Sequence, residues 1–151
     1  MAGNGKNVIW IFGDQHRGQA LGLHGDPNVC TPNIDRLAYC GMDFPNAVAG
    51  FPLCCPFRGS LVSGIYPHKC VPGHEYPMAD DQKTIAHAFR ENGYHTAYFG
   101  KWHLAGWHES DGRAAMYKTR PEQRGGFALW LGFDNNNSQW DSWLHGHDRE
   151  G

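Results

Sequence analysis

The sequence contains no long apolar run, no excess of basic charge and no paired-cysteine motif. None of its hydrophobic stretches approaches the roughly 18–20 residues that cross a bilayer, so no membrane partner is predicted. The formal net charge of −2 offers no basic field to a nucleic acid. With 151 residues, 40% of them hydrophobic and 19% charged, the chain has the size and composition of one globular domain.

The N-terminal residues carry no signal-peptide pattern. Met1 to Lys6 is small and polar, and the apolar run that follows is too short and too early for a signal sequence. The sequence as written therefore predicts a cytoplasmic protein, although a leader removed earlier would leave the same start.

Cysteine is present in an odd number and without any C-x-x-C pair: Cys30, Cys40, Cys54, Cys55 and Cys70. The odd count argues against a disulfide framework, and the missing pair argues against a structural zinc site. Cys54 and Cys55 are adjacent in the sequence, and this pair requires an explanation.

The order of apolar segments is that of an α/β protein. Residues 8–12 predict a short strand buried on both faces of a parallel sheet, and residues 94–99 predict a second strand. Asp14 falls at the C-terminal end of the first strand, which is the edge where open α/β sheets bind ligands. A polar stretch over residues 108–126 reads as a loop or insertion.

Three helices are predicted between these segments. Thr31 and Pro32 suit the N-cap and first position of a helix that ends at Gly41. Pro56 suits the first turn of a second helix, which runs to Gly64. A third, amphipathic helix is predicted from residue 81 to residue 92.

The most informative stretch is residues 54–64, in which Cys54 is followed by Pro56 and Arg58. With proline at the first helical position, residue 54 lies just ahead of a helix N-terminus, where unpaired N–H groups and the helix dipole favour an anion. Arg58, about one turn into the helix, can reach back to the same anion as a fixed cation. The spacing thus predicts an anion site at Cys54.

Other interpretations of the cysteines stay open at this point. A thiolate phosphatase needs cysteine and arginine six positions apart, and Ser60 and Leu61 occupy those positions. A low-pKa thiol at a helix N-terminus and a pair of buried structural cysteines both fit Cys54 and Cys55.

Three segments taken together resemble the sulfatase family, in the family's order and at family-like separations. Cys54 has proline and arginine at the family's offsets, whereas counting from Cys55 those offsets fall on Phe57 and Gly59. Asp14-Gln15 precedes this motif, and Gly100-Lys101-Trp102-His103-Leu104 follows it. The resemblance covers residues 7–107 well and continues more loosely to residue 146.

The resemblance implies the following chemistry. A formylglycine-generating maturation enzyme oxidises Cys54 to formylglycine, whose hydrated gem-diol is the nucleophile. Asp14 and Gln15, together with residue 54, bind a divalent metal, Ca²⁺ in preference to Mg²⁺ or Mn²⁺, and their carboxylate and amide oxygens are the ligands that Ca²⁺ prefers. Gln15 replaces the commoner aspartate, which lowers the negative charge of the site. From its position alone, Asp14 could equally form a turn or cap a helix.

Arg58, Lys101 and His103 are the further catalytic residues that the resemblance implies. Alternation along a strand would place Lys101 and His103 on one face, where the lysine can clamp the charge of a sulfate and the histidine can carry a proton. A solvent-facing lysine and a core histidine are the structural alternative.

The implied fold is α/β, the N-terminal part of an alkaline-phosphatase-like α/β/α sandwich with a mostly parallel sheet. Residues 1–107 would form the N-terminal part of the catalytic domain, and residues 108–151 a looser, truncated continuation or insertion. Family members are several times longer and take further metal ligands from their second half. We therefore expect a fragment with an open sheet edge, which associates with itself or with the missing C-terminal half.

The expected function is hydrolysis of a sulfate ester, either a small molecule or a sulfated glycan. Phosphonate monoester and phosphodiester hydrolases of the same superfamily, which also begin with Asp-Gln, are one alternative. An inactive fragment that only binds an anion is the other.

Overall fold

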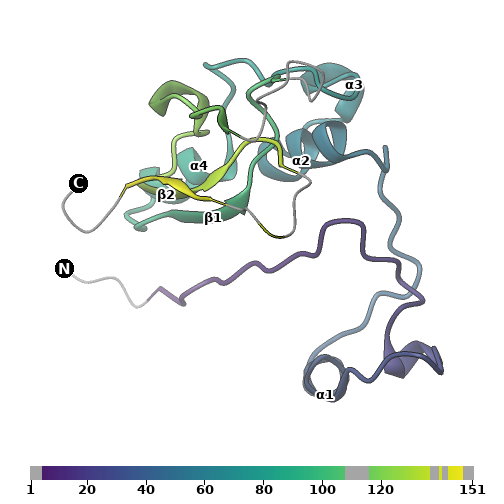
Figure 1. Cartoon of the computed structure of the whole chain (residues 1–151). Helices are drawn as coiled ribbons and strands as arrows, with labels where there is room; N and C mark the ends of the chain where they lie inside the picture. Colours follow the sequence, from purple (N-terminus) through teal and green to yellow (C-terminus); the bar gives the residue numbers. More distant parts are fainter. Residues whose placement is uncertain (1–4, 108–115, 137–139, 141–142, 148–151) are drawn as a thin grey trace. The chain divides into compact units, whose positions relative to one another are not determined.

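The computed structural model describes residues 5–107, 116–136, 140 and 143–147 (Figure 1). It divides into two units, Met1–Val48 and Ala49–Gly151. Part of the predicted loop over residues 108–126 lies outside the described residues. No helix in the described ranges is long and apolar enough to cross a membrane.

The predicted strand over residues 8–12 is wrong. The segment belongs to no strand, and Ile9 and Ile11 are 84% and 88% exposed; Figure 1 shows it as a plain purple ribbon. A strand buried in a parallel sheet needs neighbours that complete its hydrogen bonds, and no strand in the described part of the chain pairs with this segment. The apolar run indicates a segment suited to burial, but it does not specify the strand with which that segment would pair.

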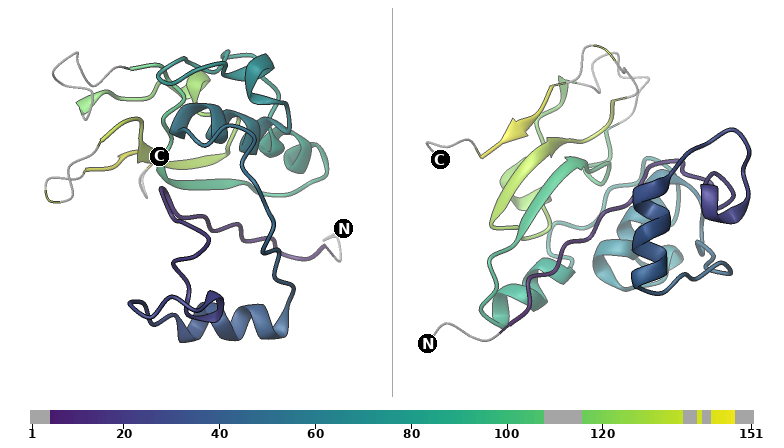
Figure 2. Two further views of the ribbon diagram at one scale, coloured as in Figure 1. Left: turned by 90° about the vertical axis from the view of Figure 1, so that its right-hand side faces the viewer. Right: turned by 90° about the horizontal axis from the view of Figure 1, so that it is seen from below.

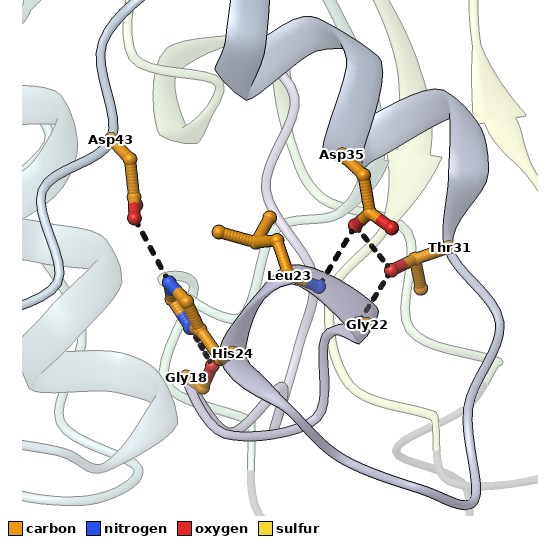
Figure 3. A network of polar contacts seen from close by, with 7 residues as sticks. All are labelled: Gly18, Gly22, Leu23, His24, Thr31, Asp35 and Asp43. Atoms are coloured by element: carbon orange, nitrogen blue, oxygen red, sulfur yellow. Dashed lines mark hydrogen bonds and ion pairs between the residues drawn. The ribbon is translucent and has the colours of Figure 1, made fainter.

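In the first unit, helix α1 (Pro32–Cys40) begins after Thr31 and ends at Gly41, as predicted. Thr31 makes no capping bond to the helix. Its hydroxyl instead donates to Asp35 at 2.7 Å and accepts the first backbone N–H of the 3₁₀ helix η1 (Gly22–His24) at 2.8 Å (Figure 3). These side chains tie α1 to the turn that precedes it.

His24 completes the same network of polar contacts (Figure 3). Its Nδ1 lies 2.6 Å from the carbonyl oxygen of Gly18, and its Nε2 lies 3.0 Å from the carboxylate of Asp43. The bond to Gly18 and then the carboxylate of Asp43 raise the pKa of His24. The first unit therefore holds its turns by its own side chains.

The second unit contains a three-stranded sheet. Its helices are α2 (Cys54–Ser63), α3 (Pro67–Cys70), α4 (Ile85–Glu91) and the 3₁₀ helix η4 (Pro121–Gln123), and its strands are β1 (Ala97–Lys101), β2 (Leu129–Phe133) and β3 (His145–Gly146). The strand order is β1-β2-β3, with β1 parallel to β2, Gly100 opposite Gly132, and β3 antiparallel to β2. The right-hand view of Figure 2 shows the three strands side by side. The sheet of the described residues is mixed.

Helix α2 begins two residues earlier than the sequence predicted. Leu53 is its N-cap and Cys54 its first residue, so Pro56 occupies the third helical position and not the first. Proline is tolerated there because the first N–H groups of a helix have no partner within the helix. Residue 54 therefore lies inside the first turn, where the positive end of the helix dipole still acts.

Helix α4 begins later than predicted, at Ile85 rather than near residue 81. Thr84 is its N-cap, and its hydroxyl accepts the backbone N–H of Ala86 at 3.2 Å. The Nδ1 of His87 in turn accepts the backbone N–H of Thr84 at 3.2 Å, which completes a capping box. The cap decides the boundary, whereas the amphipathic pattern extends beyond it.

One buried cluster joins α2 to the sheet. Its members are Cys55, Val62, Val71, Met78, Tyr98, Trp102, Leu104 and Trp130. Trp102 is fully buried and meets the ring of Tyr98 edge-to-face at 4.9 Å. Phe99, next to Tyr98 in β1, is 67% exposed, as expected from the alternation of a strand. The cluster anchors the C-terminal end of β1, where the predicted lysine and histidine are found.

Candidate active site

Cys54 lies at the N-terminus of α2, opposite the end of β1. The ammonium of Lys101, the last residue of β1, donates to the sulfur of Cys54 at 3.6 Å. The structure therefore brings together two residues that are 47 positions apart in the sequence. A cation and a helix N-terminus at one point form a site for an anion.

Arg58 links the same helix to the same strand. Its side chain is buried, and its Nη1 donates to the hydroxyl of Tyr98 at 3.2 Å and to the carbonyl oxygen of Lys101. The Tyr98 hydroxyl also donates to the carbonyl oxygen of Lys101. A guanidinium has five N–H donors in a rigid fork, so Arg58 can hold the end of β1 and also face an anion at Cys54.

His103 lies beside these residues in a conformation that the sequence did not predict. Its φ is 56°, in the left-handed region, so the strand alternation that was expected to align it with Lys101 is wrong at this position. The chain leaves β1 at Lys101 and turns before His103. Left-handed conformations are uncommon outside glycine and often mark functional sites.

The ring of His103 is buried, and neither of its nitrogens has a hydrogen-bond partner among the described residues. Burial, followed by the charges of Lys101, His74 and Arg58, lowers the pKa of His103 to about 3. The imidazole is therefore neutral at pH 7, and it is a weak base unless a negative charge lies beside it. It is not a fixed cation.

Asp134 is a buried residue of this region that the sequence interpretation missed. It follows β2 directly, and its Oδ1 accepts the backbone N–H groups of Leu104 and Ala105 at 3.0 and 2.9 Å. Burial raises the pKa of the Asp134 carboxyl. It fixes the turn immediately after His103, and its position at a strand's C-terminal end was the signal that could have identified it.

Cys55 differs sharply from its neighbour. It is 1% exposed, and its sulfur accepts the backbone N–H of Glu75 at 3.2 Å. Burial raises the pKa of its thiol to about 11, so it remains protonated and unreactive at neutral pH. Of the two adjacent cysteines, Cys54 is the one placed beside Lys101.

Asp14 and Gln15 lie next to each other in an exposed turn of the first unit. Their carboxylate and amide oxygens are the hard donors that Ca²⁺ or Mg²⁺ takes, so their chemistry fits the implied metal. Within the described residues, no group of three or more His, Cys, Asp or Glu side chains is assembled around one point. Their convergence with Cys54, which belongs to the second unit, stays a prediction.

Comparison with known proteins finds sulfatases among the relatives of this chain. An ulvan-active sulfatase of Formosa agariphila is 42% identical over 127 residues, which are 82% of this chain and 23% of that protein. An endo-4-O-sulfatase of Bacteroides thetaiotaomicron is 33% identical, covering 94% of this chain and 35% of that protein. The chain thus spans about a quarter to a third of the length of these curated relatives.

A solved structure named as the sulfatase yidJ of Bacteroides fragilis superposes with a TM-score of 0.70 at 30% identity, over 82% of this chain and 30% of that one. The α/β fold inferred from the sequence, that of the alkaline-phosphatase-like sulfatases, is thereby confirmed. Residues 6–148 also match the family model described as Sulfatase. The chain belongs to the sulfatase family.

Proposed function

We propose that this chain provides the nucleophile and the anion-binding side chains of a sulfuric ester hydrolase in which Cys54 is converted to formylglycine. The observation that carries the proposal is the 3.6 Å contact between Lys101 and Cys54 at the N-terminus of α2. The sulfur of Cys54 stands in for the gem-diol oxygens of the hydrated aldehyde. An anionic sulfate ester would then meet the nucleophile, a helix N-terminus and a lysine together.

In the first step, one diol oxygen of residue 54 attacks sulfur while the bond between sulfur and the alcohol oxygen breaks, so that the sulfate is carried on residue 54. The attacking hydroxyl gives up its proton and the leaving oxygen gains one, so the products are the sulfated residue and a neutral alcohol. Lys101 and Arg58 stabilise the negative charge on the sulfate oxygens. Asp14 and Gln15 would hold a divalent cation, which supplies Lewis-acid polarisation of the reacting oxygens when it is bound.

In the second step, the remaining hydroxyl of residue 54 loses its proton, its oxygen forms the C=O bond and the C–O bond to sulfate breaks. His103, neutral because its pKa is lowered to about 3, accepts this proton. A bound sulfate raises the pKa of the imidazole, because a nearby negative charge favours the protonated form. Water then adds to the aldehyde and restores the diol.

The substrate class that we propose is a sulfated glycan, because the relatives include an ulvan-active sulfatase and an endo-4-O-sulfatase. The Asp14-Gln15 start also fits the phosphonate monoester and phosphodiester hydrolases of the same superfamily. A comparison of kcat/KM for a sulfate ester and a phosphonate ester separates the two, and we expect the sulfate ester to be preferred.

The modification of Cys54 is tested by peptide mass spectrometry with aldehyde labelling after coexpression with a maturation enzyme. We expect the label on residue 54 and none on Cys55, because Pro56 and Arg58 stand at the family's offsets from Cys54. A label on Cys55, or no label while a control sulfatase is labelled in the same cells, would refute the proposal.

A further inference from the structure

A segment between α3 and α4, the 71–78 loop, begins at Val71 and ends at Met78. It has no role in the proposed mechanism. Both end residues are buried, and the backbone N–H of Met78 donates to the carbonyl oxygen of Leu104 at 2.9 Å. This bond ties one end of the loop to the residue that follows His103. The loop therefore borders the candidate active site.

The middle of the loop is held by Cys55. The backbone N–H of Glu75 donates to the Cys55 sulfur at 3.2 Å, and Glu75 has a φ of 61°. This left-handed conformation is unfavourable for a residue with a side chain and persists only where the surroundings enforce it. The buried thiol of Cys55, the residue next to Cys54, supplies such a constraint.

This turn places His74 against the active-site histidine. The rings of His74 and His103 meet edge-to-face, with their centroids 5.5 Å apart and their planes at 78°, and the Nδ1 of His74 lies 4.0 Å from the sulfur of Cys55. His103 is 3% exposed, whereas His74 is open to solvent. His74 is therefore the outer of the two histidines, at the solvent side of the site.

We propose that His74 is a specificity-determining residue, which contacts the alcohol part of the sulfate ester, and that Cys55 positions it through the 71–78 loop. The proposal rests on the proposed sulfatase function. Lys101 and His103 belong to the inner part of the site, where the sulfate group would bind, so the alcohol part projects outward past His74. An imidazole can donate a hydrogen bond to a hydroxyl, or accept one from it, and the hydroxyl groups of a saccharide fit this requirement.

The first experiment measures KM and kcat for a sulfated saccharide, together with the inhibition constant of inorganic sulfate, in the full-length protein that contains this chain. For His74→Ala we expect KM to rise roughly tenfold, the value of one hydrogen bond. The inhibition constant of inorganic sulfate should stay unchanged, because inorganic sulfate has no alcohol part. Conversion of Cys54 is quantified in every sample, so that a difference in maturation is not mistaken for a difference in binding.

The second experiment tests Cys55 with matched variants. Cys55→Ala should raise KM as His74→Ala does, and Cys55→Ser should restore most of the wild-type KM, because its hydroxyl can also accept the N–H of Glu75. Cys70→Ala is the control. Its half-buried thiol donates to the carbonyl oxygen of Ile65 at 3.7 Å in the same unit, so its loss should lower stability without raising KM.

Two results overturn the inference and are distinguishable from each other. If the wild type hydrolyses the sulfated saccharide but His74→Ala and Cys55→Ala leave KM unchanged, the 71–78 loop has only a structural role. If the wild type with fully converted residue 54 neither hydrolyses nor binds the saccharide by calorimetry, the proposed function fails and the inference fails with it.

Discussion

Arg58 joins the helix of the nucleophile to the strand that ends at the lysine. Arg58 is 5% exposed, and its guanidinium donates to the hydroxyl of Tyr98 and the carbonyl oxygen of Lys101. A charged group removed from water is tolerable only when its donors are satisfied. The residue assigned to anion binding therefore also carries part of the packing between α2 and β1.

We expect Arg58→Ala to lower the free energy of unfolding by about 1.5–3 kcal/mol, the value of hydrogen bonds to a charged group. The measurement is urea denaturation followed by tryptophan fluorescence. Arg36→Ala, which removes an exposed arginine from α1, is the control and should change the same quantity by less than about 0.5 kcal/mol. Equal losses in the two variants would contradict the assignment of a packing role to Arg58.

His103 should make stability depend on acid pH. Its pKa is about 3 in the folded chain and about 6.5 when unfolded, so between these values only the unfolded state binds the proton. The free energy of unfolding therefore gains a contribution that increases with pH from about 3 to 6.5 and is lost as the pH falls. Denaturation of the wild type and of His103→Gln at pH 4 to 7 measures this contribution, and the slope should be smaller in the variant. Identical slopes would mean that His103 titrates alike in both states.

For these residues the sequence predicted which side chains lie together better than it predicted their conformation. The offsets of Pro56 and Arg58 made Cys54 the candidate nucleophile, and the structure places Lys101 beside it. The left-handed backbone of His103 and the contacts of Asp134 and His74 were not predicted, because they depend on turns closed by hydrogen bonds between distant segments.

Among the elements, the pairing of β1 with β2 determines where the site residues emerge. Gly132 lies opposite Gly100 in the parallel ladder, and a Cβ at Gly132 would overlap the carbonyl oxygen of Gly100. Since Lys101 directly follows Gly100, the closeness of these two strands sets the position of the ammonium. A side chain at residue 132 would force β1 and β2 apart.

Gly132→Ala should therefore destabilise the second unit by about 1–3 kcal/mol, as overpacking does. Gly50→Ala is the matched control, because a Cβ at Gly50 meets no atom within 4 Å, and its effect should stay within about 0.5 kcal/mol. Thermal denaturation by circular dichroism compares the two. A Gly132 variant as stable as the Gly50 variant would show that the ladder accommodates the methyl group.

The boundaries of elements were predictable where a local signal exists and not elsewhere. Thr31 and Gly41 bracket α1 as expected, because a cap and a stop act within a few residues. The apolar run at residues 8–12 gave no such information, since a strand is defined by its neighbours. The start of α4 was misplaced because Thr84 had not been recognised as its cap.

For the molecule as a whole, the candidate residues are divided between the two units. Asp14 and Gln15 belong to the first unit, whereas Cys54, Arg58, Lys101 and His103 belong to the second. The metal-ligand prediction for Asp14 and Gln15 can therefore be tested separately from the anion site of the second unit.

Asp14→Asn tests the predicted metal ligand in the full-length protein. The substitution keeps the shape of the side chain and removes its charge, so we expect the affinity for Ca²⁺, measured by calorimetry, to fall at least tenfold, which corresponds to about 1.4 kcal/mol. Turnover of the sulfate ester should fall with it, and added Ca²⁺ should restore part of the loss. Asp26→Asn is the control, since Asp26 is a partly exposed residue of the same unit whose carboxylate accepts the backbone N–H of Asn28 at 2.9 Å. If Asp14→Asn behaves like Asp26→Asn in both Ca²⁺ affinity and turnover, Asp14 only forms its turn, and the metal, if the enzyme uses one, is held by other residues.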